Sequence, residues 1–574
     1  MKIKDPSNPT SRIIIEGEGR DEWGNRYFKL AVNGSDLNVP PFSMGQIVSN
    51  PEAIYTALSN AGVNIFSPAS KTIVLNLLQG LKEGKVSFRV VTRLGWNSGA
   101  IVRPDGIIGS PKRRLETSFG DLDLEVLAKY RVRGTLEEWQ DKIASVCPGN
   151  SRLMFALGLA FTGPILKLVT GPKGGGFQFW GKKETGKTTA AMVAGSVWGC
   201  HTVAGDPEIG FAESWHTTAN EVEVTALAHT DNLLILDETF GAGLSDREVA
   251  ELVISVIMTL SQQREKARKN TGPARSWRCF FLSTSNCSLG VLAHRGRVYL
   301  DDAHRSRLTE IPLPAHGHGI YEDLHGFASG EVLTDGLMAR CRRFYGSAGL
   351  EFQRRLVADY EADKRALRKW LGHRRREYKA ALQASAENQG LKPLSRSTGR
   401  CATVYAAGSL AIKYRILPGT KEELLQAVLT CQVDGLTSGS EAEPTLTAAE
   451  SLPATALSLK AKLVGWLRQH QHEFLDLDKK LVKKSSHEFG SVLGYGATFK
   501  GKKWFYLTAD RLREILGGGP GSDQLKQDLV DSKLLKIGPA ERYVVQRPIF
   551  SEEKGNKGWR SVHALQASIL ESGD

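Results

Sequence analysis

The sequence predicts an α/β protein of several domains, in which a parallel sheet covered by helices forms the central part. Three observations support this prediction. Between residues 125 and 345, short apolar strands alternate with longer segments that suit helices. Residues 11 to 120 contain mainly short strands separated by turns, and after residue 455 helices precede a two-strand signal. With 574 residues, the chain is long enough for three or four domains, each with its own core.

Residues 1–124 are expected to form a β-rich N-terminal domain. Strand-like runs occur at residues 12–16, 27–32 and 86–91, and turn residues separate them. A helix-compatible stretch at residues 51–82 interrupts the strands. The expected structure is therefore a β-rich domain with a helical insert.

Residues 125–345 are expected to form the central α/β core. Three apolar strands carry this prediction, at residues 176–180, 233–236 and 279–282, and polar residues follow each of them directly. Strands that alternate with longer helical segments are typical of a parallel sheet covered by helices.

A helical region, expected to be a lid over the core, spans residues 346–433. Its segment 350–385 is rich in Arg, Lys, Glu, Leu and Ala and contains no proline, so it predicts one long helix. The basic residues of this helix either contact DNA or form a solvated face, and the second interpretation is favoured. A second helical block is expected at residues 399–431.

The C-terminal part is expected to be a separate domain, residues 455–574, behind a linker at residues 434–454. The linker is rich in Ser, Gly, Thr, Glu and Pro. Helices followed by a β-hairpin favour a winged-helix-like domain that binds either DNA or a partner protein. The expected elements are helices near 456–470, 508–516 and 522–532, a strand at 504–507, and two strands around 534–537 and 542–545.

Composition narrows the class of partner. Lys and Arg number 75 against 62 acidic residues, a formal charge of +13 that favours a polyanion such as nucleic acid. The seven cysteines are scattered and never form a Cys-x-x-Cys pair, which argues against a zinc module or a disulfide framework. The N-terminus lacks a signal-peptide core and no run of about 18 apolar residues occurs, so we expect a cytoplasmic protein without a membrane partner.

A phosphate-binding loop follows the first core strand. Its glycines let backbone amides curve around phosphates, Lys187 is expected to reach the β and γ oxygens, and Thr188 to present its hydroxyl to Mg²⁺. A strand precedes the loop and a helix-forming run follows it, which is the context that this motif requires. The nucleotide-binding residues are expected to be Gly181, Lys182, Lys183, Glu184, Thr185, Gly186, Lys187, Thr188 and Thr189.

The second core strand ends in two carboxylates, some fifty residues downstream of the loop. We expect Asp237 to hold the water shell of Mg²⁺ and Glu238 to polarise the water that attacks the γ-phosphate. Together the two motifs predict an ATP-hydrolysing enzyme that uses Mg²⁺.

Two further positions complete the expected catalytic set. After the third core strand, Asn286 is expected to lie between the carboxylates and the γ-phosphate, with Thr284 as the second choice. About twenty residues later, Arg307 is preferred over Arg305 as an arginine that neutralises transition-state charge on a neighbouring subunit's phosphate. An arginine that works in this way requires a ring of subunits.

The order of these motifs resembles that of the AAA+ fold. The sequence between the motifs is similar to the family catalogued as domain of unknown function nine-two-seven. That family comprises helicase-like proteins of phages, plasmids and cassette elements, related to minichromosome-maintenance-type replicative helicases. The likeness covers roughly residues 10–430. The segments that carry it are 92–96, 214–220, 276–284, 307–312 and 400–408.

The resemblance implies a hexameric ATPase that translocates on DNA in replication, with Arg400 as a lid arginine that contacts ATP. One departure concerns the sensor, because the family usually has Ser-Thr-Gly-Glu where this chain has Ser-Thr-Ser-Asn at residues 283–286. No primase-like segment precedes the motor, so an initiator or primase is an expected partner.

A basic turn lies between the second and third core strands. In helicases of this kind, a hairpin before the sensor strand enters the channel of the ring and its lysines grip the phosphates of a single strand. A turn signal at residues 270–273 stands between basic residues, although a solvated loop is the other interpretation. The expected DNA contacts are Lys266, Arg268, Lys269 and Arg275.

The sequence thus predicts a ring-shaped, ATP-dependent DNA helicase of a mobile element. A remodelling or defence ATPase without unwinding activity is the alternative from another class. An inactive DNA-binding derivative is disfavoured, because the P-loop and the Asp-Glu pair are both complete.

Overall fold

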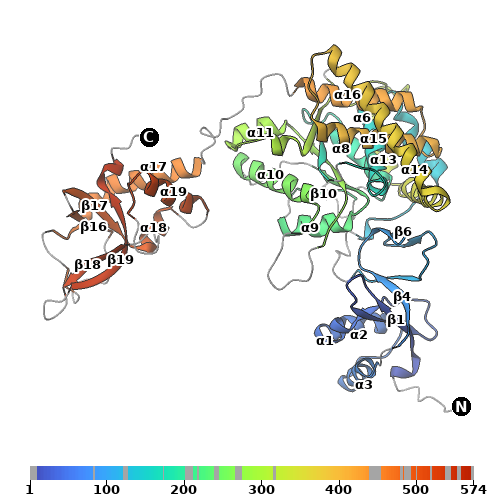
Figure 1. Ribbon diagram of the computed structural model, residues 1–574, viewed down its shortest axis with the longest axis horizontal. Helices are drawn as coiled ribbons and strands as arrows, with labels where there is room; N and C mark the ends of the chain where they lie inside the picture. The colour runs from blue at the N-terminus through green and yellow to red at the C-terminus, as the bar shows by residue number, and fades with distance from the viewer. Residues whose placement is uncertain are drawn as a thin grey trace. The chain divides into compact units, whose positions relative to one another are not determined.

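The computed structural model divides into two compact units, Met1–Gly296 with Leu300–Pro444, and Arg297–Tyr299 with Thr445–Asp574. Figure 1 shows the elements of both units. The structure describes residues 9–81, 84–119, 127–171, 174–200, 211–215, 219–237, 245–265, 275–314, 318–438, 454–478, 482–483, 493–499, 501–516, 520–536, 545–551 and 557–570.

In its described residues, the N-terminal part of the first unit is a mixed five-stranded sheet with three α-helices. The sheet has the order β3-β2-β1-β4-β8, with β1 antiparallel to β2 and parallel to β4. Ile54, Leu58 and Val74 are fully buried on the helical side. The elements are η1 Pro9–Arg12, β1 Ile13–Arg20, β2 Arg26–Val32, β3 Phe42–Ser43, α1 Met44–Ser49, α2 Pro51–Asn60, α3 Pro68–Gln79, β4 Val86–Val91 and β8 Leu115–Thr117.

A small antiparallel sheet follows, formed by β5 Gly95–Asn97, β6 Ala100–Arg103 and β7 Gly106–Ile108. The Trp96 indole donates to the Pro164 carbonyl at 2.6 Å, and the Trp96 backbone amide donates to the Asp231 carboxylate at 2.8 Å. These contacts join the small sheet to the central core.

The central sheet is parallel throughout, with the order β10-β11-β12-β9-β13. Because both faces are covered, its main strands are continuous apolar runs and almost every strand residue is buried. The third strand begins one residue later than predicted. The strands are β9 Gly176–Trp180, β10 Glu213–Ser214, β11 Leu233–Asp237, β12 Phe280–Ser285 and β13 Leu308–Pro312.

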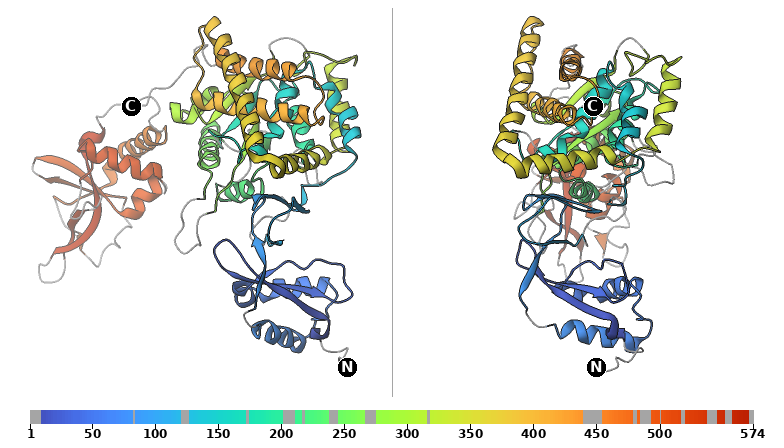
Figure 2. Two further views of the ribbon diagram at one scale, coloured as in Figure 1. Left: turned by 45° about the vertical axis from the view of Figure 1, so that its right-hand side comes forward. Right: turned by 90° about the vertical axis from the view of Figure 1, so that its right-hand side faces the viewer.

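Helices surround this sheet, as Figure 2 shows. α8 packs on β11 and β12, α16 packs on β13, and α10 packs on both α9 and α11. The helices that precede the lid region are α5 Leu136–Lys142, η2 Ala144–Val146, α6 Ser151–Ala160, α7 Thr162–Ile165, α8 Lys187–Ser196, α9 Ala219–Ala228, α10 Asp246–Gln262, α11 Leu289–Gly296, α12 Asp302–Arg305 and α13 Gly330–Cys341.

The predicted long helix is α14, Ser347–Asn388, and it bends at Asp363. Asp363 has φ −155° and ψ 92°, and its carboxylate accepts from the amides of Arg365 and Ala366 at 2.8 and 3.0 Å. Asp363 therefore caps the second half of α14 as the N-cap of a new helix would.

The second predicted helical block is two helices, α15 Ser395–Lys413 and α16 Lys421–Ser438. Gly419, with φ +91°, and the proline before it interrupt the helical path between them. α16 continues to Ser438, so helix occupies the first residues of the segment predicted as a linker.

The described residues of the second unit form a six-stranded sheet, in the order β14-β16-β17-β19-β18-β15, and three α-helices. Leu463, Leu507 and Leu565 are fully buried in its core. The predicted hairpin at 534–545 differs from the structure. Leu535 makes a single bridge to Leu565, residues 537–544 lie outside the described residues, and β18 pairs antiparallel with β19 instead. The elements are α17 Ala454–His470, η3 Gln471–Glu473, β14 Leu475–Asp476, β15 Val482–Lys483, β16 Tyr495–Phe499, β17 Lys502–Leu507, α18 Ala509–Leu516, α19 Pro520–Asp531, β18 Val545–Ser551, β19 Lys557–Gln566 and η5 Ala567–Leu570.

All seven cysteines are buried free thiols, as their scattered positions predict. Among the helices that the structure describes, none combines the length and the apolar character needed to cross a bilayer.

Candidate functional site

The P-loop connects β9 to α8 at the carboxyl edge of the central sheet. The Gly181 amide donates to the Ser285 carbonyl at 3.2 Å, which ties the start of the loop to the end of β12. Gly186 has φ +94°, and a Cβ there would lie 2.7 Å from the Ile320 side chain, so glycine is required for both reasons. Glu184 also has a left-handed φ of +58°, and backbone strain of this kind is concentrated at ligand-binding loops.

Lys187 is the first residue of α8 and is almost fully buried. Its ammonium donates to the Gly181 carbonyl at 2.9 Å and to the Lys182 carbonyl. The charge therefore lies across the inside of the loop, where the phosphates of a nucleotide would bind.

Asp237, the last residue of β11, is bonded to two hydroxyl groups. Thr284, from the adjacent strand β12, donates to Asp237 Oδ1 at 2.6 Å, and Thr188 donates to the same oxygen at 3.4 Å. β12 lies between β9 and β11, so these groups meet at one edge of the sheet. A hydroxyl beside a carboxylate is an all-oxygen donor set of the kind that Mg²⁺ prefers, so Thr188 and Asp237 fit the predicted metal role.

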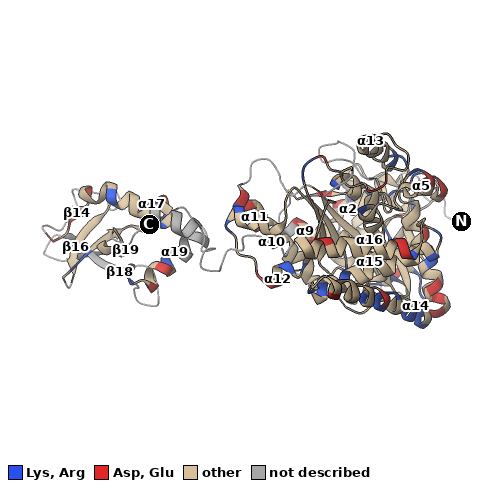
Figure 3. Ribbon diagram, turned by 90° about the horizontal axis from the view of Figure 1, so that it is seen from above, with Lys and Arg blue, Asp and Glu red and all other residues tan. Residues whose placement is uncertain are grey.

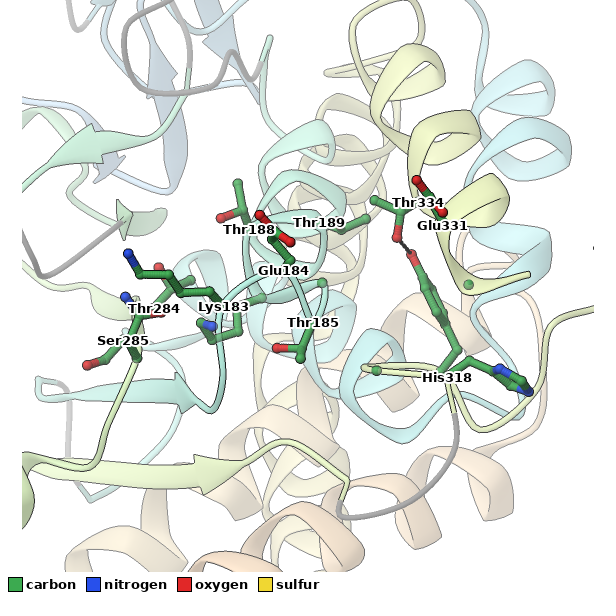
Figure 4. Close-up of a pocket in the computed structure, with 16 residues that line it drawn as sticks. Lys183, Glu184, Thr185, Thr188, Thr189, Thr284, Ser285, His318, Glu331 and Thr334 are labelled. Atoms are coloured by element: carbon green, nitrogen blue, oxygen red, sulfur yellow. Dashed lines mark hydrogen bonds between the residues drawn. The ribbon is translucent and has the colours of Figure 1, made fainter.

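A cavity of about 760 Å³ opens beside these groups, within the size range of small-molecule sites. Figure 4 shows the P-loop side chains beside Thr284 and Ser285, with His318, Glu331 and Thr334 at the other side of the pocket. The lining residues are Lys183, Glu184, Thr185, Gly186, Lys187, Thr188, Thr189, Thr284, Ser285, Asn286, His318, Gly319, Tyr321, Gly330, Glu331 and Thr334. Both sensor candidates, Asn286 and Thr284, therefore face the same cavity as the P-loop.

Sequence reasoning missed the far side of this cavity, formed by residues after β13 and at the start of α13. The Tyr321 hydroxyl and Thr334 Oγ1 lie 2.7 Å apart, and burial raises the pKa of Tyr321 to about 12. A Cβ on Gly319 would lie 2.8 Å from the Thr185 carbonyl, so this segment packs tightly on the P-loop. These residues do not form a sequence motif, because they are isolated positions in a loop and in the first turns of a helix.

Several predicted residues lie outside the described residues, namely Glu238, Lys266, Arg268 and Lys269. The residues on either side of the basic turn are described. Arg264 and Ser276 form an antiparallel bridge, and the Glu265 amide donates to the Arg275 carbonyl at 3.0 Å. Arg275 also forms an ion pair with Glu265 at 2.7 Å.

Arg305 and Arg307 lie near the start of β13, far from the P-loop of their own chain. β13 runs parallel to β9 and in register with it, and the P-loop begins at the opposite end of β9. Four residue steps along a strand separate the two ends, about 13 Å. Arg307 is half-exposed, and its guanidinium donates to the Ala303 carbonyl.

Arg400, expected to contact ATP as a lid arginine, does not line this cavity in the structure, and its contact with a nucleotide stays a prediction. Arg400 is buried at the start of β9, where it donates to the Ser306 carbonyl at 2.9 Å and to Thr309 Oγ1 at 2.7 Å, with its guanidinium over the Phe177 ring. Burial lowers its pKa to about 10. It does not line the cavity, because α15 directs this side chain to the amino-terminal edge of the sheet instead of the edge that holds the P-loop.

The fold is an α/β core with a P-loop sequence motif between β9 and α8. A family model described as Domain of unknown function (DUF927) matches residues 5–276, which reach from the N-terminal domain to the residue that closes the basic turn. The sequence also predicts a likeness to this family at residues 277–430, but the match does not extend to them. No curated protein matches the chain.

Two solved structures are similar along almost the whole length of the chain. The first is titled "SCCmec type IV Cch - active helicase", with 15% identity and a TM-score of 0.50 over 97% of this chain and 94% of that one. The second, titled "The A form apo structure of NrS-1 C terminal region-CTR(305-718)", has 11% identity and a TM-score of 0.26 over 96% and 95%. The first likeness is one of fold, and the TM-score of the second is too low to support an argument.

Proposed function

We propose that this chain is an ATP-hydrolysing DNA helicase of a mobile genetic element, built on an AAA+ core and active in replication as a ring, with a hexamer as the expected form. The observation that carries the proposal is the cluster of Lys187, Thr188, Asp237 and Thr284 at one edge of the sheet, beside a cavity large enough for a nucleotide. The insertion of β12 between β9 and β11 supports the AAA+ assignment.

In this proposal each residue has a defined part in ATP hydrolysis. The P-loop amides and the Lys187 ammonium bind the phosphates, while Glu238 accepts a proton from the attacking water. Thr188 and Asp237 would hold Mg²⁺, which neutralises charge on the phosphates when bound. Asn286 reaches the same cavity and orients the γ-phosphate or the water. Arg307 of a neighbouring subunit stabilises the charge that develops on the phosphate.

The proposed track is a single strand of DNA. The antiparallel bridge of Arg264 with Ser276 supports a hairpin whose tip would carry Lys266, Arg268 and Lys269. The ion pair of Arg275 with Glu265 favours a role for Arg275 in the hairpin stem, with the tip lysines as the main phosphate contacts. The net charge of +13 suits a DNA partner, and an initiator or primase remains a proposed second partner.

The second unit is proposed to be winged-helix-like and to bind DNA or a partner protein. Lys502 and Lys503 are exposed at the start of β17, and Trp504 follows them. Exposed lysines at the end of a strand suit phosphate contacts.

Strand displacement tests the proposal directly. Lys187→Ala removes the phosphate-binding charge and Glu238→Gln removes the base, so each variant is expected to lower ATP turnover at least 100-fold and to abolish unwinding of a forked duplex. Phosphate release and fluorescence-detected strand separation measure the two activities. Unwinding that survives in either variant contradicts the proposal.

Neutralising the lysines at the proposed hairpin tip distinguishes a helicase from a remodelling or defence ATPase. A Lys266→Gln/Lys269→Gln variant of a helicase loses the stimulation of ATP turnover by single-stranded DNA and keeps basal turnover. If single-stranded DNA does not change the turnover of the unaltered chain either, the remodelling ATPase replaces the helicase as the proposed function.

A further inference from the structure

The second half of α14 carries a basic face that the nucleotide site does not use. The helix restarts after the bend at Asp363, and its apolar side is fixed by Leu371, Tyr378 and Leu382, which are almost fully buried. Six exposed cations lie beside this buried side, and Figure 3 shows basic residues in blue along α14. They are Lys364, Arg365, Arg368, Lys369, Arg376 and Lys379.

Helical geometry places these six residues on one face. At 100° per residue the six cations fall within about 140° of the helix circumference, and the buried residues Arg375 and Leu382 lie at one margin of this arc. From Lys364 to Lys379 the face is about 22 Å long. It is rigid, because the Tyr378 hydroxyl donates to Gln432 at 2.7 Å and anchors α14 to α16.

The charge of this face is not neutralised by neighbouring carboxylates. Residues 364–376 contain no acidic residue, and among the described residues none forms an ion pair with the six cations. The nearest acids are engaged elsewhere. Glu361 accepts from the Ser110 amide at 2.7 Å, and Asp363 caps the helix. Glu377 pairs with Arg374 at 2.8 Å, on the flank of the face.

The face suits phosphates in a duplex better than a single strand. Proteins that hold single strands stack bases on exposed aromatic rings. Within the described part of α14 no aromatic side chain is fully exposed, and the half-buried ring of Trp370 lies between the cations of Arg374 and Lys413 at 5.6 and 5.5 Å. A rigid row of cations without a stacking platform recognises phosphate backbone alone.

We propose that this face of α14 binds the phosphate backbone of duplex DNA. The contact is distinct from the nucleotide cavity and from the basic turn, and it goes beyond the proposed helicase activity because it requires neither ATP nor a single strand. A motor that holds the duplex on α14 keeps the fork close while the proposed hairpin engages one strand.

Salt-dependent binding to a fluorescent 30-base-pair blunt duplex, measured by anisotropy with the full chain and without nucleotide, tests this contact. The variant is Lys364→Gln/Arg365→Gln/Arg368→Gln/Lys369→Gln. Each lost phosphate contact lowers the slope of log K against log salt by about 0.9, so the slope is expected to fall by about 3 to 4 and the low-salt affinity at least tenfold. The altered residues are exposed, so the thermal melting curve is expected to stay unchanged.

A matched control lowers the net charge by the same four units at scattered exposed positions, Arg113→Gln/Arg133→Gln/Lys392→Gln/Arg415→Gln. In this control the slope of log K against log salt is expected to stay within about one unit of the value for the unaltered chain, since a single phosphate contact accounts for about 0.9. An equal loss in both variants overturns the proposal, because total charge then explains the binding. An equal loss of single-strand binding in the α14 variant also overturns it. Failure of the helicase proposal would appear separately, as an absence of ATP turnover or of unwinding. The duplex-binding assay measures neither of these activities.

Discussion

At the scale of single residues, Asp237 depends on Thr284 for its position. The Thr284 hydroxyl is almost fully buried and donates to Asp237 at 2.6 Å, whereas the Thr188 contact to the same oxygen is longer, at 3.4 Å. A hydrogen bond to a charged group contributes about 1.5–3 kcal/mol. Thr284 therefore contributes to holding the Asp237 carboxylate at this edge of the sheet.

Thr284→Val removes this hydroxyl and keeps the shape of the side chain. We expect ATP turnover to fall about 10- to 100-fold, because about 1.4 kcal/mol corresponds to a factor of ten in rate. Phosphate release at several Mg²⁺ concentrations measures the effect, and a higher Mg²⁺ requirement is expected with it. Thr284→Ser, which keeps the hydroxyl, is the control and retains turnover within about threefold. Unchanged turnover in the valine variant would show that Asp237 is positioned by other groups.

At the scale of elements, Asp231 joins three segments that are distant in sequence. Its carboxylate accepts from the Trp96 amide at 2.8 Å and from two nitrogens of Arg278, each at 2.8 Å. Asp231 is buried with φ +60°, and Gly95 leaves no room for a Cβ, which would lie 2.2 Å from the carboxylate. The small sheet is thus fixed to the segments that lead into β11 and β12.

Asp231→Asn keeps the shape of this junction and removes the charge that pairs with Arg278. We expect the free energy of unfolding of the core to fall by about 3 kcal/mol, because a largely buried guanidinium loses its only carboxylate among the described residues. Urea denaturation measures the loss. Glu52→Gln breaks the ion pair with Lys71, in which both side chains are exposed, and is expected to cost under about 1 kcal/mol. Equal costs in the two variants would contradict the anchoring role of Asp231.

The sequence predicts well those elements that are local and buried. The strands that contain Phe179, Ile235 and Phe281 are continuous apolar runs, and the P-loop is recognisable because its chemistry depends on adjacent residues. The junction at Asp231 and the cavity wall around Tyr321 depend on tertiary contacts, which leave no periodic signal in the chain. The position of Arg400 beside Ser306 and Thr309 could not be predicted either, because a likeness of sequence does not specify toward which edge of the sheet a helix directs a side chain.

At the scale of the whole molecule, the position of Arg307 bears on assembly. It lies at the edge of the sheet opposite to its own P-loop, about 13 Å away along β9 and β13. An arginine there serves catalysis only at the site of a neighbouring subunit, and a head-to-tail ring provides such a neighbour at every interface. Mixing of variant subunits therefore tests whether Arg307 acts at the site of a neighbouring subunit.

Mixing Lys187→Ala subunits with Arg307→Ala subunits tests catalysis between subunits. Each variant alone is expected to hydrolyse ATP at least 100-fold more slowly, because each site lacks either the lysine or the arginine. In an equal mixture about one quarter of the interfaces combine an intact P-loop with an intact arginine, so turnover is expected to recover to about a quarter of the unaltered value. Phosphate release before and after subunit exchange measures the recovery. The same mixture with Arg305→Ala in place of Arg307→Ala shows which of the two arginines acts. If a mixture is no more active than each variant alone, the arginine and the P-loop do not form a shared site between subunits.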